Sequence, residues 1–136
     1  QTTHTEQYVL VAKPHLASQI NSISDLKSHT LVDISSSFPL FRYFGESNQL
    51  RPQEIFSQYR YLSTISALLY WVLKQDAFAV LPLYFVQDTI ATQEVSVVLP
   101  QLDLQHDHFR LFWTKNHWAE SSITQLADFL SAHPLK

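Results

Sequence analysis

The segment from residue 55 to residue 82 constrains the fold most, because three elements with different hydrophobic periods follow one another there. Side chains alternate between two faces over residues 55–62, as they do in a β-strand. Apolar residues then recur three and four positions apart over residues 65–73, which is the stripe of an amphipathic helix. Residues 77–81 are wholly apolar and end at Pro82, which is typical of a buried strand. This order predicts a βαβ unit.

The rest of the chain continues the alternation of strands and helices. Short apolar or alternating runs predict further strands over residues 8–12, 30–34, 94–99 and 109–114. Helical spacing, caps and prolines predict further helices over residues 15–19, 40–47, 83–90 and from about 121 to just before Pro134. We therefore expect an α/β fold with a mostly parallel, mixed sheet that is flanked by helices.

Local signals add detail to the predicted helices. Ser24 and Ser63 stand where N-caps are expected, before a brief turn at residues 25–27 and before the middle helix. Gly45 is expected to close the helix over residues 40–47. The face that the last helix turns inward is expected to consist of Ile123, Leu126, Ala127 and Leu130.

Composition excludes several classes of function. The chain has 136 residues, 46% of them hydrophobic and 15% charged, which allows one modest folded domain. Its net charge of −3 leaves no basic stripe, so we expect no nucleic-acid binding by this chain itself. Cysteine is missing, which excludes disulfides and thiol chemistry, and a single glycine excludes glycine-rich phosphate loops.

No stretch of about 20 apolar residues occurs, so no membrane span is expected. The first residues lack the pattern of a secretion signal, and the composition is compatible with the cytoplasm. Because no initiator methionine opens the sequence, we expect it to be a fragment of a longer protein.

Ser63 and Thr64 are the first candidate binding residues. They stand at the start of the middle helix, where free N–H groups and the positive end of the helix dipole favour an anion. Their hydroxyls would add further donors. The alternative is that Ser63 is only an N-cap, and the two roles are compatible.

Two further groups of candidates follow the carboxyl ends of predicted strands, which is where open α/β sheets bind ligands. Ser36, Ser37 and Phe38 follow the strand over residues 30–34, and Pro82 and Tyr84 follow the strand over residues 77–81. The alternative interpretation is that these are ordinary solvated loops.

Metal and catalytic sites are disfavoured. His106 and His108 would share one face of a strand, and Asp103 could be a third ligand. Two histidines do not make a zinc site, however, and we interpret the segment as a polar loop, so no metal and no cofactor are predicted. The serines at 35–37 have no base nearby in sequence, and the carboxylates show no paired spacing, so the chain is not expected to be an enzyme.

A set of short segments, taken in order, resembles a known family. They are YVLVA at 8–12, ISDL at 23–26, TLVDI at 30–34, LSTISAL at 62–68, AFAVLP at 77–82, FRLFW at 109–113 and ITQLADFL at 123–130. Together they resemble the C-terminal two-thirds of the effector-binding domain of LysR-type transcriptional regulators, which has the fold of type II periplasmic binding proteins. One departure is the turn before Ala77, where the family usually has glycine and this chain has Gln75 and Asp76.

The resemblance implies that residues 13–105 form the second lobe and residues 106–136 return to a first lobe. It also implies that a small-molecule effector binds between the lobes, at the turn that contains Ser63 and Thr64. DNA would be contacted only by an N-terminal winged helix-turn-helix outside this chain. The alternative is an extracytoplasmic solute-binding protein of the same fold that serves transport. The apolar faces of the return segment must then cover the second lobe or another copy of the chain, and we expect a homo-oligomer.

Overall fold

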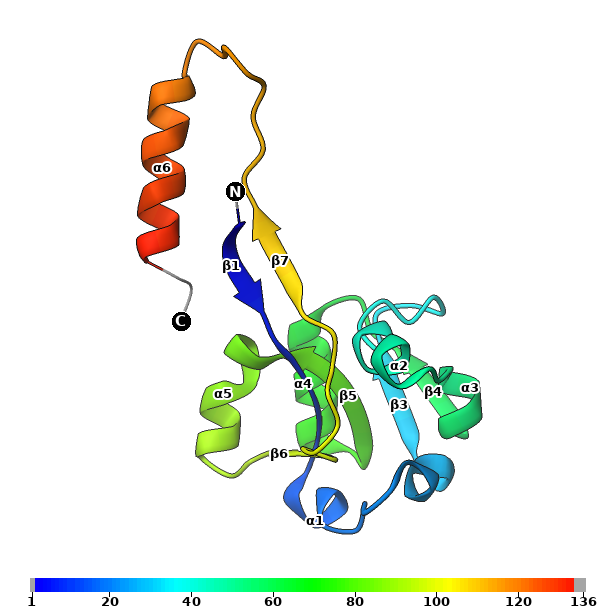
Figure 1. Cartoon of the computed structure of the whole chain (residues 1–136). Coiled ribbons are helices and arrows are strands. Elements are labelled where there is room, and N and C mark those ends of the chain that lie inside the picture. Colours follow the sequence, from blue (N-terminus) through cyan, green and yellow to red (C-terminus); the bar gives the residue numbers. More distant parts are fainter. Residues whose placement is uncertain (1, 134–136) are drawn as a thin grey trace. The chain divides into compact units, whose positions relative to one another are not determined.

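The computed structural model describes residues 2–133 and divides into two compact units (Figure 1). The larger unit is Gln7–Gln105, and the smaller one combines Gln1–Glu6 with His106–Lys136. None of the described helices is both long enough and apolar enough to cross a membrane.

The larger unit is built around a five-stranded sheet with the order β4-β3-β5-β2-β6. Its strands are β2 (Tyr8–Ala12), β3 (Thr30–Asp33), β4 (Gln58–Tyr61), β5 (Ala77–Pro82) and β6 (Ser96–Val97). Strand β3 pairs in parallel with β4 and β5, whereas β2 runs antiparallel to β5 and β6. The sheet is therefore mixed, and the predicted α/β class is confirmed. It is less parallel than expected, because two of its four strand pairs are antiparallel.

Helices cover both faces of this sheet. They are α1 (Pro14–Ala17), the 3-10 helix η1 (Ile23–Ser28), α2 (Arg42–Asn48), α3 (Pro52–Ile55), α4 (Ile65–Lys74) and α5 (Leu83–Ala91). Because successive strand residues point to opposite faces, Phe78 joins one core cluster and Ala79 the other. The first cluster includes residues of α2 and α3, and the second includes Leu68 and Val72 of α4.

The smaller unit pairs β1 (Thr2–Glu6) with β7 (Asp107–Arg110) in an antiparallel ribbon, and α6 (Glu120–Ala132) packs against β1. Ala127 is buried, as predicted for the inner face of α6. Leu126 was expected on the same face but is 49% exposed. The physical reason is that a single strand pair is too narrow to cover the whole apolar stripe of a helix.

Several predicted boundaries in the larger unit are wrong. The run over residues 55–62 becomes strand only at Gln58, because Pro52 starts helix α3 and the Glu54 carboxylate accepts a bond from the Arg51 amide. Gly45 lies inside α2, which ends at Asn48 and is followed by Gln49 in the left-handed conformation. A Cβ at Gly45 would come within 2.6 Å of the Leu50 carbonyl oxygen. Glycine is therefore needed here because the backbone at Leu50 packs closely against it.

Other corrections concern shorter elements. The cap of η1 is Ser22 and not Ser24, since Asp25 accepts bonds from the amides there. Only Ser96–Val97 of the strand predicted over 94–99 pairs with a neighbour. The strand predicted over 109–114 lies at Asp107–Arg110 instead, because its partner is β1, which the sequence analysis did not anticipate. The segment of His106 and His108 is therefore largely strand, not a polar loop.

Candidate ligand site at the carboxyl edge of the sheet

The three predicted binding segments follow the ends of β3, β4 and β5. Since β3 is parallel to both neighbours, the carboxyl ends of the three strands meet at one edge of the sheet. Asp33 at the end of β3 is in register with Tyr61 at the end of β4. Segments 36–38, 63–64 and 82–84 therefore all follow strand ends at this edge. The cavity that Ser36, Ser37 and Phe38 line contains none of the other four predicted residues.

Thr64 is the N-cap of α4. Its Oγ1 accepts a hydrogen bond from the Ala67 amide at 3.1 Å, which corrects the prediction that Ser63 is the cap. Ser63 and Thr64 are both exposed. Because a helix of ten residues leaves orphan N–H groups at its start, this turn presents donors and a positive dipole end to solvent.

The serine loop after β3, residues 34–40, is held by the buried carboxylate of Asp33. Its Oδ1 accepts from the amides of Ile34 at 2.6 Å and Leu40 at 3.3 Å, and its Oδ2 accepts from Phe41 at 2.9 Å. Burial raises the pKa of Asp33, and these three amide bonds act in the opposite direction. Asp33 therefore fixes the loop while Ser36 and Ser37 stay exposed.

Asp33 is a residue of this arrangement that was not predicted from the sequence. The one available signal was a carboxylate that ends an otherwise apolar strand directly before a serine-rich loop. Such a residue commonly accepts bonds from the backbone of the loop or the next helix. Its partners, seven and eight residues away, could not be identified from local spacing.

Phe38 is placed differently from its neighbours. It adopts φ 50°, which is strained for a bulky residue, and its side chain is 8% exposed. Its ring meets Tyr59 and Tyr61 edge-on, with centroid distances of 5.3 and 5.8 Å. Phe38 also lines a 340 Å³ cavity together with Ser36 and Ser37. The loop conformation therefore ties the serine loop to the aromatic side of β4.

The third segment begins helix α5. Pro82 is buried and Tyr84 is 41% exposed. The Leu83 amide donates to the Gln7 carbonyl at 2.7 Å, which fixes the start of α5 to the residue that precedes β2. None of the described residues forms a group of three metal ligands.

The family of the chain follows from a sequence comparison. The family model described as LysR substrate binding domain matches residues 3–134, so this chain belongs to that family. A search of curated protein sequences gave no match.

Solved structures with the same fold include several regulatory domains. The reduced regulatory domain of OxyR2 from Vibrio vulnificus matches with a TM-score of 0.73 and 15% identity, over 97% of this chain and 63% of that one. The regulatory domain of CrgA, a LysR-type transcriptional regulator from Neisseria meningitidis, matches with a TM-score of 0.71 and 15% identity, over 100% and 68%. The apo regulatory domain of HypT from Salmonella typhimurium matches with a TM-score of 0.70 and 15% identity, over 98% of this chain and 65% of that one. This chain thus spans about two thirds of each.

Proposed function

We propose that this chain is the ligand-sensing part of a LysR-type transcriptional regulator and that it binds a small anionic molecule at the carboxyl edge of its sheet. The observation that carries the proposal is the convergence of three strand ends with the start of α4 at that edge. The family match, and the regulatory domains among the similar structures, favour regulation over transport.

The chemistry of the edge supports an anion. Orphan amides at the start of α4 and the hydroxyls of Ser63 and Thr64 are donors, and the helix dipole favours negative charge. Ser36 and Ser37 add hydroxyls from the next strand end, and Tyr84 adds an exposed aromatic side chain. The site acts by binding and not by catalysis. A ligand shifts the regulator only as far as its affinity differs between two arrangements.

The rest of the proposal concerns the whole protein. The larger unit corresponds to the second lobe, whose predicted range was 13–105, and the smaller unit corresponds to the return into the first lobe. The remaining third of the relatives' length would supply the rest of that lobe. DNA is contacted by an N-terminal winged helix-turn-helix outside this chain, and the protein works as a homo-oligomer in the cytoplasm.

A thermal-shift screen tests the binding site. Small carboxylic acids and amino acids are added to the chain, and a ligand is expected to raise the melting temperature by mass action. Ser63→Ala should reduce the ligand-induced shift and leave the melting temperature without ligand unchanged. Ser121→Ala is the matched control, since it changes an exposed serine in the first turn of α6. If a ligand's shift survives Ser63→Ala and Ser36→Ala, it binds elsewhere and the proposed site is wrong.

A further inference from the structure

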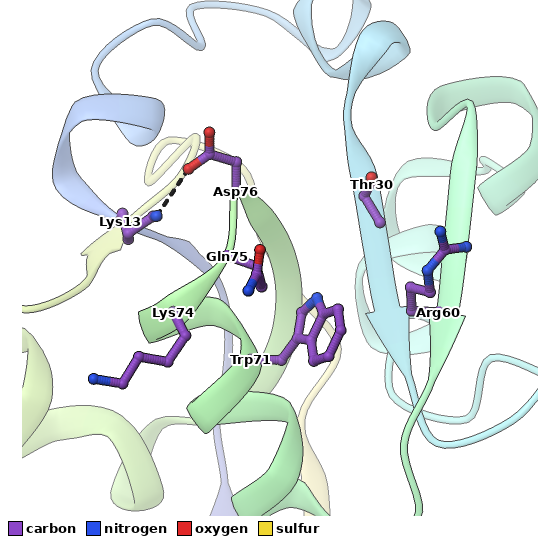
Figure 2. A pocket seen from close by; sticks show the side chains of 7 residues that line it. All are labelled: Lys13, Thr30, Arg60, Trp71, Lys74, Gln75 and Asp76. Atoms are coloured by element: carbon purple, nitrogen blue, oxygen red, sulfur yellow. Dashed lines mark ion pairs between the residues drawn. The ribbon is translucent and has the colours of Figure 1, made fainter.

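A cavity of about 440 Å³ lies at the opposite edge of the same sheet, where β3 and β5 begin and α4 ends (Figure 2). None of the seven binding residues predicted from the sequence lines this cavity. Three of the chain's nine Lys and Arg residues do, namely Lys13, Arg60 and Lys74, whereas Asp76 is the one lining residue among twelve acidic ones. A chain with net charge −3 thus concentrates positive charge in one cavity.

The ion pairs within residues 2–133 involve only one of these cations, and the Lys74 ammonium instead lies 5.9 Å from the centre of the Tyr70 ring. Lys13 Nζ lies 2.8 Å from Asp76 Oδ1, and this contact lowers the pKa of Asp76, which is therefore ionised at neutral pH. Within residues 2–133, neither Arg60 nor Lys74 has an ion pair with a carboxylate. The Arg60 guanidinium instead donates to the neighbouring Tyr59 carbonyl at 3.1 Å. It can therefore accept a stronger, anionic partner.

Trp71 gives the cavity a flat apolar wall. Figure 2 shows its indole between α4 and β3, and it is half-buried. Arg60 is in register with Val32, which packs in the core cluster of α4, so Arg60 extends from the face of the sheet that α4 covers. Thr30, two residues before Val32, shares this face, and its hydroxyl donates to Gln58 Oε1 at 3.3 Å. Charge and aromatic surface are thus presented together.

We propose that this cavity is a second binding site, for a small organic anion that carries a flat apolar group. The anionic group would bind Arg60, whose planar fork suits a carboxylate or phosphate. The flat group would pack on the Trp71 indole. Lys74 would strengthen the field, although Figure 2 shows its ammonium turned away from Trp71. Most of its lining lies around the starts of β3 and β5, whereas Arg60 is near the carboxyl end of β4, three residues before Ser63. The proposed site does not depend on the function proposed above.

Phenyl phosphate is the probe that tests this site, because it joins a ring to an anion. Phenol carries the ring alone and inorganic phosphate the charge alone. Binding is followed at low salt by the NMR signal of the Trp71 indole, which a Trp71→Phe variant assigns. We expect phenyl phosphate to shift this signal and to bind about tenfold more tightly than either half. Equal binding of inorganic phosphate would show that Trp71 contributes nothing.

Two variants are expected to change the affinity for phenyl phosphate in opposite directions. Arg60→Gln should weaken phenyl phosphate binding about tenfold, because it removes the charged guanidinium and its paired N–H donors. Asp76→Asn should strengthen it several-fold, because it removes the only lining carboxylate, whereas any effect of lost structure would weaken it. Lys27→Gln is the matched control, an exposed cation outside the cavity, and should change binding little.

The location of the shifted signals separates this proposal from the previous one. If phenyl phosphate shifts Ser63 and Thr64 but not Trp71, the second site is refuted and the edge site is supported. If it shifts Trp71 while Ser63→Ala has no effect on any ligand of the screen, the second site stands without the first. A binding constant unchanged by both Arg60→Gln and Asp76→Asn would overturn the second site outright.

Discussion

The two units of this chain differ in how much apolar surface they cover by themselves. Within the described chain, every fully buried apolar residue except Ala127 belongs to the larger unit. The smaller unit instead exposes 80% of Phe112 and 93% of Trp118. Burial of apolar area is the main stabilising term in folding, at about 25 cal/mol per Å². The larger unit therefore has a core of its own, whereas the smaller one depends on further cover.

This difference has a consequence for function. Both binding sites proposed above lie within the larger unit, on strand ends and on α4, which packs on buried residues. A site needs a rigid support to hold its donors in place. The smaller unit instead exposes aromatic residues, and exposed apolar surface commonly marks an interaction site.

The largest expected effect is on the core of the larger unit. Phe78 is fully buried in β5, and Phe78→Ala should lower the free energy of unfolding by about 3–5 kcal/mol. Phe112→Ala removes the same ring from an exposed position and should change it by less than about 0.5 kcal/mol. Urea unfolding of both variants measures this. Equal losses would show that the smaller unit has a core that exposure does not reveal.

Asp33→Ala should have the next largest effect. It leaves the amides of Ile34, Leu40 and Phe41 without their acceptor, at a cost of about 1–3 kcal/mol. The serine loop should also lose protection of these amides, which hydrogen exchange measures. Asp103→Ala, at an exposed carboxylate, is the control. Unchanged protection would mean that Asp33 does not hold the loop.

Helix caps allow a smaller comparison between the units. Thr64 caps α4 with its side chain, whereas Ala119 at the start of α6 has no side-chain cap. Thr64→Ala should therefore lower the free energy of unfolding by about 1 kcal/mol, whereas Thr64→Ser should keep most of the stabilisation that the cap provides. Ala119→Ser should stabilise the chain, by less than Thr64→Ala destabilises it. Thermal unfolding would contradict this comparison if both substitutions at Thr64 cost the same.

Much of the larger unit could be predicted from the sequence, because β5 is wholly apolar and α4 has a clear helical stripe. The convergence of the predicted segments at one edge could be anticipated, because the ends of parallel strands meet by geometry alone. Strand β1 was missed because its sequence, TTHTE, has no apolar pattern, and only its pairing with β7 makes it a strand.

The second cavity could not be predicted from the sequence because its walls come from distant positions. Lys13 stands between β2 and α1, Arg60 lies on β4 and Trp71 on α4, and only the fold brings them together. No periodicity or local motif links such residues. The same limit applies to the bonds of Asp33, which span seven and eight residues.

A buried acid in the smaller unit should give a weaker, pH-dependent effect. Glu6 is 2% exposed, and within the described chain its Oε1 has no hydrogen-bond partner. Burial, and to a lesser degree Asp107, raise its pKa above the ordinary 4.5. Ionisation then costs the folded state more than the unfolded one, so stability should fall as pH rises from about 4.5 through the raised pKa. Glu6→Gln should flatten this part of the profile in unfolding experiments, while Glu94→Gln, at an exposed site, should not.

The smallest effect on stability, and the clearest on assembly, is expected from the exposed aromatics of the smaller unit. Phe112 and Phe129 are 80% and 57% exposed, so replacing both by serine should barely change unfolding. It should, however, shift the chain toward monomer in sedimentation experiments, because exposed apolar surface drives association. Tyr70→Ser, at a 62% exposed ring of the larger unit, is the control. If the double variant associates as the parent does, or if the parent is already monomeric at high concentration, these residues do not drive self-association, and the contrast between the units concerns stability alone.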